Sequence, residues 1–212
     1  MLTRLLALVL LGVATACSAQ TAPTAETFTA GTDYFLIEPS QPTSSGDKIE
    51  VLEVFGYSCS HCASFEPKIA EWKKTLAADV SFNYMPAMFG GIWENFARAY
   101  YTAETMGILG KTHEAMFKAV HVEKTIQAVE DIPAFYASHG VNADEFAATM
   151  NSFAVNAKVG RSQQQVPRYG VSSTPTMIVA GKYRIEASGP NSHERMLQVA
   201  DFLVAKERAA AK

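Results

Sequence analysis

The fold is decided by residues 49–62, whose sequence is IEVLEVFGYSCSHC. Residues 49–55 alternate between two faces that are both largely apolar, which is typical of a central strand covered on each side. Gly56 ends this strand, and a helix is predicted to begin around Cys59. Apolar side chains then recur at spacings of three and four, in one buried helical stripe that Pro67 is expected to kink. The stripe consists of Cys62, Phe65, Ile69, Trp72 and Leu76.

The sequence on both sides of this stretch continues an α/β pattern. Residues 80–85 predict a second strand, and a strand–helix–strand unit makes its two strands parallel, with a right-handed crossover. Residues 34–37 predict a short edge strand. Far along the chain, residues 175–179 and 183–185 flank a tight turn and predict a hairpin. A last helix, capped by Ser192, is expected to follow this hairpin.

A block rich in Ala, Met, Phe and Glu separates the two α/β parts. Glycine and asparagine residues divide it into several predicted helices, with Thr125 or Asp131 and Asn142 as candidate N-caps. The chain is therefore expected to form an α/β domain with an inserted helical subdomain. The expected parts are residues 31–91 and 167–212 for the domain and residues 92–166 for the insertion.

The first 19 residues have the pattern of a secretory signal peptide. Arg4 precedes an unbroken apolar run at 5–13, which is too short to span a bilayer, and small residues follow it. Residues 20–30 are expected to be a flexible lead-in. Cys17 has two interpretations: it is either the lipid-bearing first residue of a lipoprotein or part of the segment that cleavage removes.

Composition limits the function only broadly. The chain has 212 residues, enough for one well-buried domain with an insertion. Its formal net charge is −3, and no basic stretch is interleaved with aromatic residues. Nucleic-acid binding is therefore not expected.

Cys59 and Cys62 are the only cysteines beyond the predicted signal region. A disulfide between them closes too short a loop to stabilise a fold appreciably. Zinc requires about four ligands, and no second cysteine pair is present, so no metal is expected. A thiolate at Cys59 would meet the free N–H groups and positive end of the predicted helix. The pair is therefore interpreted as a redox couple, with Cys59 reactive and Cys62 buried as the resolving thiol.

Two nearby ionisable residues are candidates for supporting this chemistry. His61 lies between the cysteines, where its imidazole could stabilise the Cys59 thiolate and make the disulfide a stronger oxidant. Glu53 lies on an apolar strand face, where burial would raise its pKa and make it a proton acceptor for Cys62. The alternatives are an exposed histidine without a role and a glutamate exposed at a sheet edge.

Residues 51–66, VLEVFGYSCSHCASFE, resemble the active-site region of the DsbA family in the thioredoxin superfamily. The resemblance extends from about Phe28 through the final helix and implies a thioredoxin-like fold with a helical insertion. It also implies that Cys59 is the nucleophile, Cys62 the resolving thiol and Glu53 the buried acid. Two positions depart from the family pattern: Ser60 replaces its commonest proline, and Thr174 replaces the valine of its best-known member.

The resemblance further implies a substrate-binding role for residues 174 and 175. Pro175 would be a cis-proline facing the disulfide, and Thr174 would present its backbone to the substrate peptide. The implied activity is donation of a disulfide to reduced, unfolded exported polypeptides in the periplasm, by a monomer without a prosthetic cofactor. Reoxidation would require a DsbB-like, quinone-linked membrane protein.

Two other functions remain open at this stage. The same residues could serve a reducing or isomerising relative, since threonine before the cis-proline is frequent in such proteins. A non-catalytic periplasmic peptide-binding or chaperone module with a vestigial disulfide is the second alternative.

Overall fold

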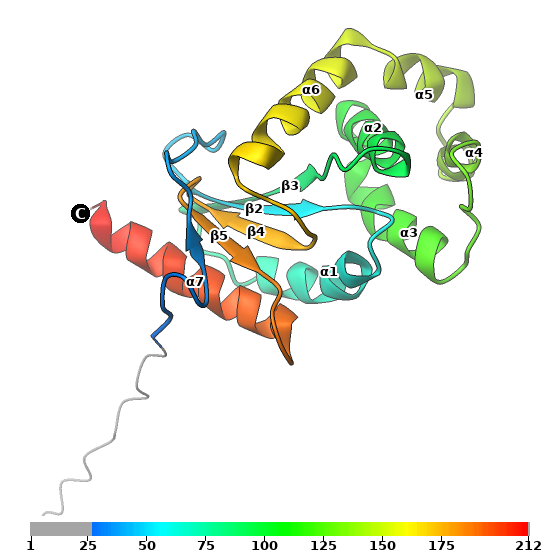
Figure 1. Ribbon diagram of the computed structural model, residues 1–212. Coiled ribbons are helices and arrows are strands. Elements are labelled where there is room, and N and C mark those ends of the chain that lie inside the picture. The colour runs from blue at the N-terminus through cyan, green and yellow to red at the C-terminus, as the bar shows by residue number, and fades with distance from the viewer. Residues whose placement is uncertain (1–26, 212) are drawn as a thin grey trace, which may run out of the picture.

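A five-stranded sheet lies at the centre of the computed structural model, which describes residues 27–211 (Figure 1). The predicted signal peptide, Cys17 and the first part of the lead-in lie outside these residues. The strand order is β1-β5-β4-β2-β3, with β2 and β3 parallel, as predicted, and all other neighbours antiparallel. The strands are β1 (Phe35–Leu36), β2 (Ile49–Phe55), β3 (Val80–Pro86), β4 (Thr176–Val179) and β5 (Tyr183–Glu186).

Helices cover both faces of this sheet (Figure 1). α1 and α7 lie against one face, and the C-terminal end of α6 lies against the other. α1 continues as one helix through Pro67, and the kink expected at this residue stays a prediction. The helices are α1 (Ser60–Lys73), α2 (Ile92–Thr105), α3 (Leu109–His121), α4 (Asp131–Ser138), α5 (Ala143–Met150), α6 (Phe153–Arg168) and α7 (Ser192–Ala210).

The two apolar faces of β2 explain its central position. Val51 packs with α1 and α7, whereas Leu52 and Val54 belong to the core beneath the end of α6. β3 and β4 pair with β2 on either side. A strand buried on both faces and paired on both edges holds the residues at its C-terminal end in place.

The helices α2–α6 lie between β3 and β4 in the sequence and form a separate layer beside the sheet (Figure 1). Their core includes Phe55, Tyr57 and Cys62, together with Tyr100 of α2 and Phe117 of α3. The helical insertion therefore packs directly against the end of β2 and the start of α1. Among residues 27–211, no helix combines the length and apolar character needed to cross a bilayer.

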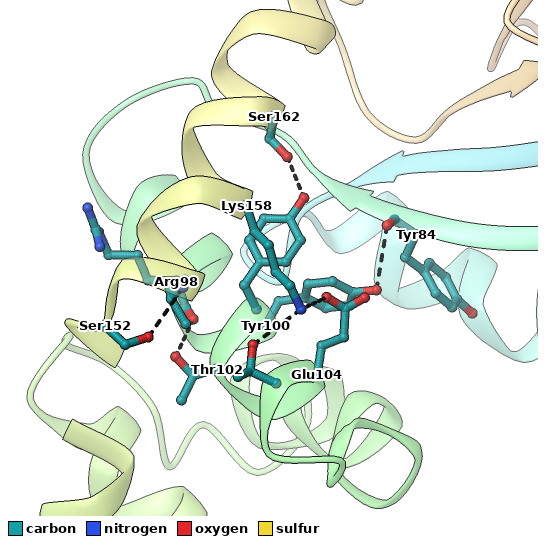
Figure 2. Close-up of polar contacts among 11 residues, drawn as sticks. Tyr84, Arg98, Tyr100, Thr102, Glu104, Ser152, Lys158 and Ser162 are labelled. Atoms are coloured by element: carbon teal, nitrogen blue, oxygen red, sulfur yellow. Dashed lines mark hydrogen bonds and ion pairs between the residues drawn. The ribbon is translucent and has the colours of Figure 1, made fainter. Parts of the chain in front are cut away.

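Polar contacts join α2 to α6 and to the sheet (Figure 2). The Tyr101 hydroxyl and the Ser162 hydroxyl are hydrogen-bonded inside the helical layer, and Lys158 Nζ lies 2.7 Å from Glu104 Oε2 nearer the surface. The Tyr100 hydroxyl donates to the carbonyl oxygen of Tyr84 in β3, at 3.5 Å. The position of the insertion relative to the sheet is thus fixed by hydrogen bonds as well as by apolar packing.

Of the candidate helix caps, Asn142 is confirmed, and Thr125, Asp131 and Ser192 are wrong: the N-cap of α4 is Glu130. Asn142 is the N-cap of α5, and its side chain accepts from the Glu145 N–H at 3.0 Å. Asp131 is instead the first residue of α4, because its carboxylate reaches backward to the N–H groups of residues 127 and 128. Ser192 likewise begins α7, whose N-cap is Asn191 in a left-handed conformation.

Candidate active site

Cys59 occupies the N-cap position of α1. Its backbone is extended, with φ −86° and ψ 114°, and its sulfur accepts the N–H of Cys62 at 3.3 Å. Both cysteines are free thiols, Cys59 half-buried and Cys62 1% exposed. The sequence folds this way because Gly56 ends β2 and its carbonyl accepts the Cys59 N–H at 3.0 Å, which turns the chain into the helix.

The surroundings of Cys59 favour its thiolate and lower its pKa from 9.0 to about 5. The largest cause is a hydrogen bond from the Cys62 thiol; the Thr174 hydroxyl and the backbone N–H groups of Cys62 and His61 add to it. Partial burial opposes this lowering. At neutral pH the reduced protein therefore carries a thiolate at Cys59.

Cys62 has the opposite character. Burial is the main cause that raises its pKa, and the hydrogen bond with Cys59 and the nearby charge of Glu53 raise it further. One thiol of the pair is therefore charged and partly exposed, while the other is neutral and enclosed. This difference is what an exposed attacking sulfur and a buried resolving sulfur require.

Thr174 and Pro175 lie opposite Cys59, although 115 residues separate Thr174 from Cys59 in sequence. The Thr174–Pro175 peptide bond is cis. The Thr174 carbonyl oxygen lies 3.4 Å from Cys59 Sγ and accepts from the protonated thiol. The Thr174 hydroxyl has the contrary effect, since it donates to the thiolate and lowers its pKa. A second cis bond, Glu38–Pro39, is a feature that the sequence does not predict.

Glu53 lies in the middle of β2 and is 1% exposed. Its strand neighbours are Tyr84 and Met177, so the alternative of a glutamate at a sheet edge is excluded. Burial is the main cause that raises its pKa, followed by the charges of Glu66 and Cys59. The charge of Cys59 thus acts on Glu53, and the charge of Glu53 acts on Cys62.

His61 lies on the exposed side of the first turn of α1. Among the described residues its imidazole makes no hydrogen bond, and it is its backbone N–H that lowers the pKa of Cys59. The reason is geometric: the N-cap sulfur lies over the helix end, where the backbone N–H groups point. An electrostatic effect of the His61 imidazole on the thiolate stays a prediction.

A buried polar cluster behind Glu53 was not foreseen from the sequence. Glu66 is 7% exposed and accepts from the Tyr84 hydroxyl at 2.9 Å. His113 Nε2 lies 3.4 Å from Glu66 Oε2, and His113 Nδ1 lies 2.8 Å from the Tyr57 hydroxyl. Glu66 carried a usable signal, because it follows Cys62 by four residues on the same helical face.

The family model that matches this chain is DsbA-like, and two similar relatives are DsbA proteins. A family model described as a DSBA-like thioredoxin domain matches residues 77–200. The chain is 41% identical to the thiol:disulfide interchange protein DsbA of Pseudomonas aeruginosa over 189 residues, 89% of this chain and 90% of that protein. It is also 41% identical to the DsbA of Pseudomonas syringae pv. tomato over 201 residues, 94% of each.

Solved structures are similar as well. The crystal structure of Pseudomonas aeruginosa DsbA superposes with a TM-score of 0.80 at 40% identity and covers 87% of this chain and 96% of that one. The oxidoreductase DsbA of Xylella fastidiosa gives a TM-score of 0.79 at 37% identity, with 84% and 96% covered. The similarity thus extends over both the sheet domain and the helical insertion.

Proposed function

The chain belongs to the DsbA family of thioredoxin-like thiol:disulfide oxidoreductases, and from this premise we propose that it donates its Cys59–Cys62 disulfide to unfolded exported polypeptides. The observation that carries the proposal is the position of Cys59 at the N-cap of α1, where its sulfur accepts the Cys62 N–H at 3.3 Å and where its pKa is lowered. A thiolate that is stabilised in the reduced protein makes the disulfide a strong oxidant.

The reaction begins when a substrate thiolate attacks Cys59 Sγ of the disulfide. The Cys59–Cys62 bond breaks, a mixed disulfide forms at Cys59, and Cys62 leaves as a thiolate that takes up a proton. Glu53 is the proposed donor of this proton, because burial raises its pKa and its charge acts on Cys62.

A second substrate thiolate then attacks the substrate sulfur of the mixed disulfide. Cys59 leaves with the electron pair of the broken bond, and its low pKa makes it a good leaving group. The substrate is oxidised by two electrons. The protein ends with a thiolate at Cys59 and a thiol at Cys62, and the second substrate proton goes to solvent.

Substrate is proposed to bind beside Thr174 and Pro175. The Thr174 backbone reaches Cys59 Sγ, so a peptide that attacks this sulfur must pass along residues 174 and 175. An extended peptide can pair there with main-chain groups, which gives affinity without dependence on substrate sequence.

The remaining parts of the proposal concern location and partners. We place the protein in the periplasm, as a monomer, with residues 1–19 as its signal and Cys17 either removed or lipid-bearing. Reoxidation of the dithiol is assigned to a DsbB-like, quinone-linked membrane oxidase. Mass spectrometry of the mature amino terminus would decide the fate of Cys17.

The test is oxidation of a reduced, unfolded ribonuclease by the oxidised protein, with thiols trapped by alkylation. Stoichiometric transfer of one disulfide is expected from the native chain and none from Cys59→Ala or Cys62→Ala, because neither variant can form the Cys59–Cys62 disulfide that is donated. Unchanged activity in Cys59→Ala would favour the chaperone alternative. A reduction potential near the roughly −270 mV of thioredoxin would favour the reducing alternative.

A further inference from the structure

Glu53 presents a problem that the proposed reaction does not solve. It is 1% exposed, yet in each cycle it must release a proton to Cys62 and regain one from solvent. Among the described residues, no hydrogen bond is formed by its carboxylate. Its direct partner in the parallel strand β3 is Tyr84, whose hydroxyl donates to the Glu66 carboxylate at 2.9 Å. Glu66 therefore lies next to the pair of Glu53 and Tyr84, and its charge raises the pKa of Glu53.

Glu66 in turn is paired with a buried histidine of the helical insertion. The side chains of Glu66 and His113 are each 9% exposed, and His113 Nε2 lies 3.4 Å from Glu66 Oε2. Among residues 27–211, Nε2 has no hydrogen-bond partner of good geometry. A buried imidazole nitrogen that faces a carboxylate is suited to exchange a proton with it.

A groove connects this pair to the surface. It has a volume of about 360 Å³, enough for several water molecules, and both Glu66 and His113 line it. Titratable groups face His113 from each element around it. Those in contact with His113 are Glu66 of α1, Tyr57 after β2, Tyr84 of β3 and Tyr100 of α2, and the groove that His113 lines is also lined by Lys73, Glu104 and Glu114.

We propose that His113 and Glu66 form the outlet through which Glu53 exchanges its proton with solvent. A proton from groove water binds His113 Nε2, passes to the Glu66 carboxylate and replaces the proton that Glu53 gives to Cys62. During reoxidation the same proton moves outward, and no electrons are exchanged in either direction. His113 is thus a positioning residue that acts through Glu53, and the inference rests on the proposed function.

The structure supplies a matched control in a second histidine of α3. His121 Nε2 lies 2.7 Å from the Tyr57 carbonyl oxygen, as His113 Nδ1 lies 2.8 Å from the Tyr57 hydroxyl. Both histidines are therefore hydrogen-bonded to Tyr57, which lies two positions before Cys59. Only His113 also contacts Glu66.

The experiment measures reduction of the Cys59–Cys62 disulfide by excess dithiothreitol across the pH range, with rates divided by the reductant thiolate concentration. His113→Ala is expected to slow the reaction by about tenfold and to flatten its pH profile. Free imidazole should restore the rate, because it can enter the groove. His121→Ala should keep the native profile whatever its rate, and imidazole should not affect it.

Identical pH profiles for the two histidine variants, or no rescue of His113→Ala by imidazole, would overturn the inference. If His113→Ala does not fold, Glu66→Gln serves instead, with a flattened profile and no rescue expected. Failure of the proposed function would be seen separately, as native protein that leaves reduced ribonuclease unoxidised. The dithiothreitol assay does not depend on that substrate.

Discussion

Replacing Thr174 by valine is expected to raise the pKa of Cys59 and to weaken the disulfide as an oxidant. Valine has nearly the same shape as threonine but lacks the hydroxyl that donates to the Cys59 thiolate. A hydrogen bond to a charged group contributes about 1.5–3 kcal/mol when buried, and the half-exposed sulfur reduces this to about 1 kcal/mol. That free energy corresponds to a pKa increase of about 0.7. The reduction potential should fall by about 20 mV.

The assay is the ultraviolet absorbance of the thiolate in the reduced protein, titrated with pH against the oxidised protein as blank. Equilibration with glutathione gives the reduction potential of the same variants. Thr176→Val is the matched control, because it removes a buried hydroxyl that donates to the Ser173 carbonyl oxygen at 2.8 Å, away from Cys59. An unchanged Cys59 pKa in Thr174→Val, or an equal shift in Thr176→Val, would refute the assigned hydrogen bond.

Three further predictions follow from the same geometry. The thiolate of Cys59 should stabilise the reduced form against urea, because the pKa of the Cys59 thiol falls from 9.0 to about 5 on folding. Its contribution to the free energy of unfolding is complete above pH 9 and is lost as the pH falls through 5. At neutral pH it should amount to about 1–2 kcal/mol after allowance for solvent screening, and equal pH dependence of the reduced and oxidised forms would contradict it. Glu53→Gln should raise the urea midpoint at neutral pH and slow disulfide exchange. Burial raises the pKa of the Glu53 carboxyl, so its ionisation above pH 4.5 favours the unfolded chain, and glutamine removes this cost. An unchanged or lowered midpoint would argue against a buried acid. Gly56→Ala should lose about 1–3 kcal/mol in denaturant unfolding, because the added Cβ would overlap the ring of Trp93, and Trp93→Leu should relieve the loss in the double variant.

Local patterns in the sequence predicted many of the helices and strands. β2 was predictable because both of its faces are apolar, and the start of α1 was predictable because Gly56 separates a strand period from a helical period. The hairpin of β4 and β5 and the Asn142 cap have equally local causes. Asp131 misled because a carboxylate near a helix start can bond backward as well as forward.

Spacing alone predicted the site only where its residues are close in sequence, and the approach of residues 174 and 175 to Cys59 was expected only from the family resemblance. Cys59 and Cys62 are linked by helix geometry, which spacing reveals. Two contacts form only when distant segments of the chain pack together: Thr174 with Cys59, and His113 with Glu66. The spacing of apolar residues shows which face of a helix or strand is buried, but it does not show which other element covers that face. His61 is exposed, and its side chain forms no hydrogen bond among the described residues, so its expected electrostatic effect on the Cys59 thiolate stays a prediction.

The two departures from the family's commonest pattern have unequal consequences for the direction of the reaction. The Ser60 side chain forms no hydrogen bond among the described residues and is exposed on the first turn of α1, so it adds no contact to the sulfur. Thr174 supplies a hydroxyl that lowers the pKa of Cys59, which valine could not do. A lower thiol pKa stabilises the reduced protein and strengthens the oxidant. Threonine at position 174, although frequent in reducing and isomerising relatives, therefore favours disulfide donation in this chain.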